Sequence, residues 1–211
     1  MKRLLVALAA ACPVLAACGG LLKSSTPPEI AYRPTLEVGT ALSPTLDAVL
    51  TVARPEAGPG LDGDAIVVGL PSARLDRVAG ARFAASVPEL LEAELVAALG
   101  ARGGWRAVAS DHSAFSGTYL LQTEIRHFSA DYAAVGTAPV VRVVIHAELG
   151  RVRDRHLVAT VDAVGEAPAS ADRQAAIVAA FGTAMGQAVT MLGSFAHAAA
   201  LAERDRPAAS R

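Results

Sequence analysis

Three long segments in the second half of the chain alternate apolar and polar residues. Residues 118–128, 139–149 and 156–164 each place every second side chain on one apolar face. Such alternation predicts β-strands with one covered and one solvated face, as in antiparallel sheets. Arg151–Arg155 is short and charged, so the last two strands are expected to form a hairpin. The centre of the fold is therefore predicted to be an antiparallel meander.

The covered face of this meander is expected to consist of small and branched apolar side chains. They are Tyr119, Leu121, Ile125, Val141, Val143, Ile145, Ala147, Leu149, Leu157, Ala159, Val161 and Ala163. Shorter strands are predicted at 48–52, 65–70 and 105–109, where apolar runs end at Pro, Gly or polar residues. Residues 75–78 are expected to form a short edge strand.

Two helices are predicted. Ser86 and Glu89 have the spacing of a capping box, Pro88 is tolerated in a first turn, and Gly100 is a plausible stop. A longer helix is expected to start at Ser170, with its inward residues at helical spacing: Ile177, Phe181, Met185, Ala188, Val189, Leu192 and Phe195. The predicted fold class is α+β, an antiparallel sheet of about five to six strands with two main helices packed on one face.

The N-terminus has the pattern of an export signal. Lys2 and Arg3 precede an apolar stretch, residues 4–15, that is too short to span a bilayer and contains Pro13. Leu15-Ala16-Ala17-Cys18 then matches a bacterial lipobox, in which small residues fit the signal peptidase and the thiol accepts a diacylglyceryl group. Residues 1–17 are therefore predicted to be a lipoprotein signal peptide, with Cys18 as the lipid attachment site.

Two alternatives to this interpretation remain. Cys12 follows three alanines, but it lacks Leu at −3 and would leave a shorter apolar region. A cleaved secretory signal with an incidental cysteine is the other alternative. Cleavage before Cys18 also removes Cys12, so the mature chain would keep one acylated cysteine and form no disulfide. Gly19 at +2, where an Asp would resemble an inner-membrane retention signal, favours the periplasmic face of the outer membrane over the inner membrane.

Composition changes along the mature chain. Residues 18–45 contain two Gly-Gly or Ser-Ser pairs and several prolines, which predicts an extended, poorly packed tether after the lipidated cysteine. Residues 46–197 are expected to form one domain, and 198–211 a flexible tail. The chain holds 19 basic and 20 acidic residues, so it lacks the positive surplus of a nucleic-acid binder.

Motifs of catalysis or cofactor binding are missing from the sequence. Gly-x-Ser-x-Gly, Walker and Gly-x-Gly-x-x-Gly patterns do not occur, and 100–104 is glycine-rich but follows a helix, which indicates a helix stop and a turn. Glu124, His146 and Glu148 form a conceivable metal site, although an exposed polar strand face is the simpler interpretation. Asp162 and Glu166 form a conceivable acid/base pair. No enzyme, metal or cofactor is predicted. The spacing of Gly182 and Gly186 would let the last helix approach a neighbour closely, but helix-on-sheet packing within the domain is the simpler explanation.

The order and spacing of several short motifs resemble the ABC-type transport auxiliary lipoprotein family over about Tyr32 to Phe195. The motifs are Ile66-Val67-Val68-Gly69-Leu70-Pro71, Leu75-Asp76-Arg77, Arg82-Phe83-Ala84, Val87-Pro88-Glu89-Leu90-Leu91, Gly117-Thr118-Tyr119-Leu120-Leu121, Arg126-His127-Phe128 and Phe181. Relatives often carry Trp in place of Phe83, and the usual tyrosine-leading strand near the mature start is replaced by Tyr32-Arg33-Pro34. Only Cys18 maps onto a residue of known family function.

This resemblance implies a role and a partner. It implies a non-catalytic, lipid-anchored periplasmic accessory of an ABC transporter whose periplasmic protein carries an MCE domain, in systems that move lipids or other hydrophobic molecules between the two membranes. The MCE-domain protein is the implied partner, and homo-oligomers are compatible with the role. The alternative function, from a different functional class, is that of an outer-membrane lipoprotein that acts as a structural adaptor in envelope or cell-wall assembly. A lipid-anchored hydrolase would require a pocket with convergent polar groups.

Overall fold

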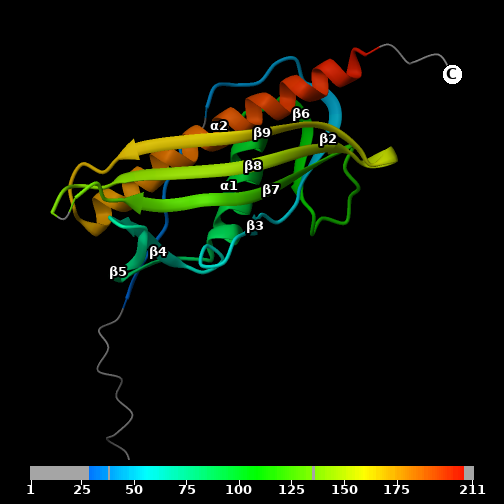
Figure 1. Cartoon of the computed structure of the whole chain (residues 1–211). Helices are drawn as coiled ribbons and strands as arrows, with labels where there is room; N and C mark the ends of the chain where they lie inside the picture. Colours follow the sequence, from blue (N-terminus) through cyan, green and yellow to red (C-terminus); the bar gives the residue numbers. More distant parts are fainter. Residues whose placement is uncertain (1–28, 38, 135, 207–211) are drawn as a thin grey trace, which may run out of the picture.

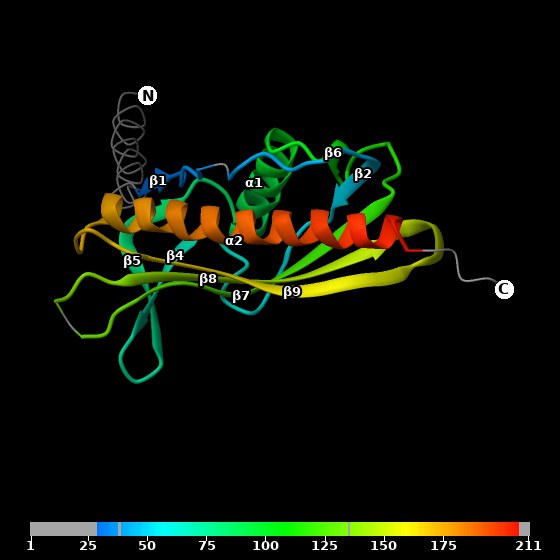
Figure 2. The same cartoon turned by 90° about the horizontal axis from the view of Figure 1, so that it is seen from above.

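The computed structural model describes residues 29–37, 39–134 and 136–206, which form one mixed sheet of nine strands covered on one face by two helices (Figures 1 and 2). The elements are β1 (Ile30–Tyr32), β2 (Leu46–Val52), β3 (Glu56–Ala57), β4 (Ala65–Leu70), β5 (Arg74–Phe83), α1 (Val87–Ala101), β6 (Trp105–Ser110), β7 (Tyr119–Asp131), β8 (Val140–Arg151), β9 (His156–Pro168) and α2 (Gln174–Arg204). The α+β class with two helices on one face is confirmed. The prediction of an antiparallel sheet with five to six strands is wrong.

The strand β7 organises the sheet. On one side it pairs antiparallel with β8, and β8 pairs antiparallel with β9 around a single 3-10 turn at Val152–Asp154, which is the predicted meander and hairpin. On its other side β7 pairs in parallel with β2 near its start, β3 in its middle and β4 near its end. β6 continues the sheet beyond β2, and β5 and β1 continue it beyond β4. Parallel strands are joined by long connections, so two strands that pair in parallel are far apart in the sequence. The alternation of residues within one short strand therefore does not reveal its parallel partner.

Two β-bulges decide which side chains of the meander reach the core. A register shift between Ile125 and His127 lets Phe128 remain on the covered face of β7, where it is buried. A second shift at Leu149/Gly150 pairs Gly150 with Leu157 and turns Leu157 to the open face, where it is 52% exposed. The expectation that Leu157 faces the core is therefore wrong, because a bulge inverts the alternation that follows it.

The expected short edge strand at 75–78 is the ten-residue β5. Its first part, including residues 75–77, pairs only with β4 and is an edge as predicted, whereas residues 81–83 also pair in parallel with β1. Arg74, Leu75 and Asp76 belong to an exposed hairpin that extends beyond the covered part of the sheet. Figure 2 shows this β4–β5 hairpin extending away from the helices.

The helix α1 begins and ends close to the predicted positions. The carboxylate of Glu89 accepts a hydrogen bond from the backbone N–H of Ser86 at 3.3 Å, which satisfies a free amide at the helix start. The helix continues one residue past Gly100, and the turn after it uses positive φ angles at Gly103 and Gly104. The interpretation of 100–104 as a helix stop and turn is confirmed.

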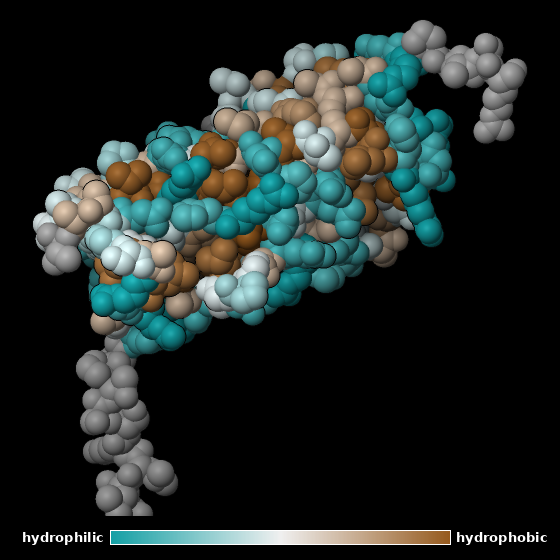
Figure 3. Space-filling model, in the orientation of Figure 1, coloured by the Kyte–Doolittle hydropathy of each residue, from teal (hydrophilic) through white to brown (hydrophobic). Residues whose placement is uncertain are grey.

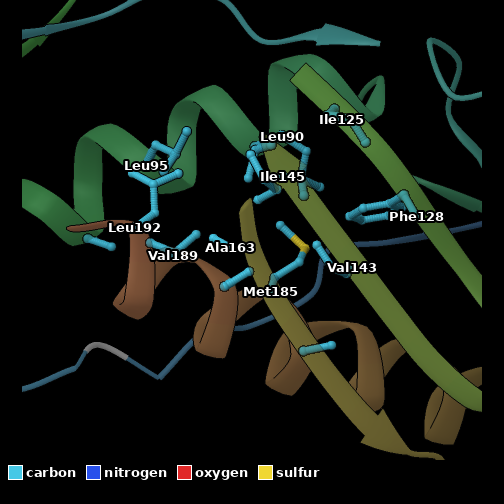
Figure 4. Packing of buried hydrophobic residues seen from close by; sticks show 14 of the residues in the cluster. Leu90, Leu95, Ile125, Phe128, Val143, Ile145, Ala163, Met185, Val189 and Leu192 are labelled. Carbon is cyan, nitrogen blue, oxygen red and sulfur yellow. The ribbon is translucent and has the colours of Figure 1, made fainter. Parts of the chain in front are cut away.

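The core lies between the helices and the covered face of the sheet (Figure 4). Leu90 and Leu95 of α1, Ile145 of β8 and Met185 and Leu192 of α2 point into it. Three fully buried aromatic rings join the β4–β5 end to α2: the centroids of Phe83 and Phe181 are 5.3 Å apart, and those of Phe128 and Phe181 are 4.9 Å apart. Such aromatic pairs contribute to the stability of the fold beyond the effect of their buried area.

Small residues let α2 approach its neighbours closely. A Cβ at Gly165 of β9 would collide with the backbone carbonyl of Ala184, and a Cβ at Gly182 would collide with the carbonyl of Thr35. Gly182 and Gly186 thus face the segment before β2, whereas Gly165 on the strand provides the close helix-on-sheet contact. The expected reason for the glycine spacing on α2 was therefore wrong.

Residues 33–37 and 39–45, here called the strap, were expected to be poorly packed tether. Instead they follow β1 along α2 towards β2 and are fixed by hydrogen bonds. The Leu42 N–H donates to the carbonyl of Arg102 at 2.8 Å, and the ring of His197 donates to the carbonyl of Pro44 at 2.9 Å. Pro34 is buried. The expected tether is thus part of the domain from residue 29 on, and residues 18–28 lie outside the described part of the chain.

One buried arginine holds the strap against both helices. Arg102, at the end of α1, is 2% exposed. Its guanidinium donates to the carbonyl of Thr40 at 2.9 Å, to the carbonyl of Thr190 at 2.9 Å and to the hydroxyl of Ser194 at 2.8 Å. The end of α1 was predicted, but the hydrogen bonds of Arg102 were not. Two of its partners, Thr190 and Ser194, lie 88 and 92 residues away in the sequence.

The expected flexible tail, 198–211, is helical as far as Arg204. Ala200 is fully buried, and the side chain of Glu203 is 6% exposed in an ion pair with Arg151. Phe195, expected inward, is half-buried. Within the described residues α2 is also the one helix long and apolar enough to cross a membrane, but 61% of its most apolar window is buried inside the domain.

Candidate interaction surfaces

The predicted lipid site, Cys18, lies outside the described residues. The structure does define where the chain reaches the domain: β1 pairs with β5, and the hydroxyl of Tyr32 donates to Oε1 of Gln174 at 3.2 Å. The N-terminal end of the domain is therefore beside the first turn of α2. Ten residues lie between Cys18 and Glu29, so the two are at most about 40 Å apart when the chain is fully extended.

The face of β7, β8 and β9 that the helices leave open is polar (Figure 3). Register places Glu124 beside His146 and His146 beside Asp162 in one row across the three strands. Its charged and polar residues are Gln122, Glu124, Arg126, His127, Ser129, Asp131, Arg142, His146, Glu148, Thr160, Asp162 and Glu166. The predicted exposed polar strand face is confirmed.

These side chains bind one another. Nδ1 of His146 lies 2.7 Å from Asp162, and Arg126 donates to Asp162 at 2.9 Å and to Glu124 at 3.2 Å. The hydrogen bond from His146, together with the positive charge of Arg126, lowers the pKa of Asp162. Arg126 therefore occupies the space between two of the acids and neutralises them.

The structure shows how the residues of the two candidate sites from the sequence are paired. Glu124, His146 and Glu148 do share one face, but Glu124 pairs with Arg126, and Glu148 is 3.7 Å from Nε2 of His146. Asp162 and Glu166 are held by separate cations, since Glu166 pairs with Arg142 at 3.4 Å. Neither set converges on a common point where an ion or a substrate would bind.

A different trio has ligand atoms close enough together for one metal ion among the described residues: Glu92, Asp111 and His112. Nε2 of His112 lies 4.0 Å from Glu92 and 3.7 Å from Asp111. The sequence did not predict this group, because Glu92 lies on α1 and the other two follow β6. The His112 side chain is 71% exposed, and ion pairs of this kind are common on protein surfaces.

A hollow lies at the opposite end of the described domain from β1. It has a volume of about 720 Å³, and its lining residues come from the start of β2, the start of β7, the β8–β9 turn and the end of α2. They are Leu46, Asp47, Ala48, Gly117, Thr118, Tyr119, Arg151, Val152, Arg153, His156, Glu203, Arg204 and Arg206. An apolar floor with a basic rim suits an amphipathic anionic ligand or peptide.

Arg151 fixes the shape of this hollow. Its guanidinium donates to both carboxylate oxygens of Asp154, at 2.9 and 2.7 Å, and also pairs with Glu203 on α2. The hydrogen bond from Arg151 lowers the pKa of Asp154 to about 2, and the same hydrogen bond raises the pKa of Arg151. The β8–β9 turn is thereby tied to the last turn of α2.

The described residues thus form a mixed sheet with one face covered by helices, one open polar face and a basic hollow at one end. The family model of the ABC-type transport auxiliary lipoprotein component matches residues 34–192. The chain therefore belongs to the ABC-type transport auxiliary lipoprotein family, and the resemblance found in the sequence is confirmed.

Solved structures agree with this assignment. Protein XCC0632 from Xanthomonas campestris, of the family DUF330, is similar with a TM-score of 0.76 and 28% identity, over 84% of this chain and 100% of that one. The crystal structure of an uncharacterised protein is similar with a TM-score of 0.60 and 18% identity, over 74% and 97%, and shows the shared fold. No curated protein matches the chain.

Proposed function

We propose that this protein is a non-catalytic, lipid-anchored accessory component of an MCE-type ABC transport system that moves lipids or other hydrophobic molecules between the two membranes. In this role Cys18 is acylated, the domain lies at the periplasmic face of the outer membrane, and it docks the MCE-domain protein of the transporter there. The family match over 34–192 is the observation that carries the proposal.

The way the chain enters the domain supports an anchored position. Because β1 and the strap belong to the fold, only ten residues connect the acylation site to Glu29. Such a connection keeps that end of the domain within about 40 Å of the bilayer. Several acyl chains on one cysteine provide lasting attachment, whereas one chain would be marginal.

The chemistry of the described surface supports a docking role. On the open face the acids of β7, β8 and β9 are paired with Arg126, Arg142 and His146. Catalytic groups instead converge on a pocket and point at a common reacting atom. We therefore expect the domain to act by binding and not by turnover.

Fractionation tests the anchor. Cys18→Ser is expected to release the folded protein from the membrane fraction, because the acyl acceptor is lost. Cys12→Ser is the matched control and should stay with membranes, since this residue precedes the proposed cleavage site. Separation of inner and outer membranes by density then tests the location. Sedimentation of Cys18→Ser with membranes would refute the anchor.

Affinity purification of the tagged lipoprotein after mild crosslinking in cells tests the partner. Recovery of an MCE-domain protein together with its permease and ATPase is expected. Recovery only of outer-membrane or cell-wall proteins would refute the transport role and favour the alternative, a structural adaptor in envelope assembly.

A further inference from the structure

The hollow and its surroundings are at the end of the domain that is farthest from the anchor. We call this region the distal end: the β8–β9 turn (151–157), the loop before β7 (111–118) and the last turn of α2 (203–206). Tyr32 of β1 contacts Gln174 at the first residue of α2, and Glu203 near its end lines the hollow. The 31 residues of α2 separate these points by about 46 Å, along the long axis that Figures 1 and 2 display.

Arginines outnumber acids at the distal end. Five arginines, at 151, 153, 155, 204 and 206, face four acids, Asp111, Asp154, Glu203 and Asp205, which leaves one positive charge. Asp154 forms ion pairs with both Arg151 and Arg153. Glu203 forms ion pairs with both Arg151 and Arg206. The side chain of Arg153 is 76% exposed and 3.9 Å from its nearest acid, so it is available to another carboxylate.

Large apolar side chains are also exposed within the segments that make up the distal end. Phe115 is 79% exposed, Leu157 52% and Val152 42%. Val152 is also part of the lining of the hollow, whose floor contains Leu46 and Tyr119. Exposed apolar groups around a pocket with a polar rim are the usual composition of a protein-binding site.

The open face of the sheet has the opposite sign. Five acids, at 124, 131, 148, 162 and 166, face Arg126 and Arg142 there. An acidic partner is therefore attracted to the distal end and repelled by the open face, which selects one docking position by charge.

We propose that the distal end docks an acidic, amphipathic segment of the transporter's periplasmic protein. One apolar side chain of that segment enters the hollow above Tyr119, and its carboxylates bind the exposed arginines, Arg153 foremost. This inference rests on the proposed function, since it names the surface that such an accessory would use.

Site-specific photo-crosslinking in cells tests the surface on the full-length lipoprotein. A photoreactive phenylalanine analogue at Val152 is expected to crosslink the MCE-domain protein within an acidic stretch, as identified by mass spectrometry. The matched control carries the same group at Gln122, an exposed position of the open face, and should give little product with that protein.

Charge reversal tests the chemistry. Arg153→Glu with Arg155→Glu is expected to reduce the yield of the Val152 crosslink about tenfold, because the partner's carboxylates lose their cations. Arg74→Glu, an exposed site on the β4–β5 hairpin, is the control and should leave the yield unchanged. Urea denaturation of each variant confirms that the fold is retained.

Several results would overturn the inference. Capture of the MCE-domain protein at Gln122 instead of Val152, or an unchanged yield in the double variant, would refute the distal end as the docking site but leave the proposed function intact. A Val152 crosslink only to a second copy of this chain, or only to lipid, would refute it as well. Absence of the MCE-domain protein at every position and in the affinity purification would refute the proposed function itself.

Discussion

Arg102 offers a sharp test of the observation that the strap belongs to the domain. Its guanidinium makes three hydrogen bonds, to Thr40 in the strap and to Thr190 and Ser194 on α2. Arg102→Ala removes all of these donors. It also leaves the carbonyl of Thr40 without its donor at a site where the arginine itself is only 2% exposed, so water replaces this donor poorly. The carbonyl of Thr190 still accepts a hydrogen bond from the hydroxyl of Ser194 at 3.0 Å.

The size of the effect follows from opposing contributions. A hydrogen bond to a charged group contributes about 1.5–3 kcal/mol. The three bonds do not add, because the buried guanidinium carries a desolvation cost that the variant no longer has. We therefore expect Arg102→Ala to lower the free energy of unfolding by about 3 kcal/mol, which corresponds to a decrease in Tm of about 6–12 °C for a domain of this size.

Urea denaturation of the mature chain, followed by circular dichroism, measures this change. Arg106→Ala is the matched control: its ion pair with Asp47 is exposed on both sides, so the loss should stay below about 1 kcal/mol. Arg102→Lys keeps the charge but cannot reach three acceptors, and an intermediate loss is expected. Limited proteolysis should cleave the strap first in Arg102→Ala. A loss in Arg102→Ala equal to that in Arg106→Ala, with an uncleaved strap, would refute the reasoning.

Two further predictions concern stability. Phe181→Ala should destabilise the domain by about 3–5 kcal/mol, because the ring is fully buried between Phe83 and Phe128; Phe115→Ala, at an exposed ring, should change stability by less than about 0.5 kcal/mol. Arg151 holds the pKa of Asp154 at about 2, below its ordinary 3.8, so this stabilisation is present above pH 4 and is lost as the pH falls through 2. Asp154→Asn should flatten the dependence of the urea midpoint on pH between 4 and 2, and an equally steep dependence would contradict the assignment.

The domain is a rigid body whose surfaces differ in their chemistry. The chain enters the domain beside one end of α2, the basic hollow lies at the other, and the sheet face with the acids of β7, β8 and β9 lies between them. Because the strap and Arg102 bind the incoming chain to both helices, a force or contact at this end of the domain is transmitted to a packed core and not to a loose linker.

Several features could be predicted from the sequence because they depend on neighbours along the chain. Alternation in 118–128, 139–149 and 156–164 gave the meander, and the short charged segment at 151–155 gave its hairpin. Capping residues Ser86 and Glu89 marked the start of α1. The polar face of the meander followed from the same alternation, since residues two apart on a strand share a face.

Other features depended on distant partners. The parallel pairing of β7 with β2, β3 and β4 joins segments that are tens of residues apart, and nothing in five or six apolar residues specifies which strand lies beside them. The bulge beside Gly150 reversed the orientation of Leu157. The trio of Glu92, Asp111 and His112 exists only because α1 lies against the end of β6.

The sequence alone determined the export pattern around Cys18, the central meander, the two helices and, through the order of short motifs, the family. All of these are encoded by local periodicity or by fixed spacing along the chain. Only the tertiary structure decided that the strap is part of the domain, that Arg102 binds it and that basic residues from the β8–β9 turn and the end of α2 surround one hollow. Arg151 and Glu203 are 52 residues apart in the chain, and packing of the helix along the sheet is what makes them neighbours.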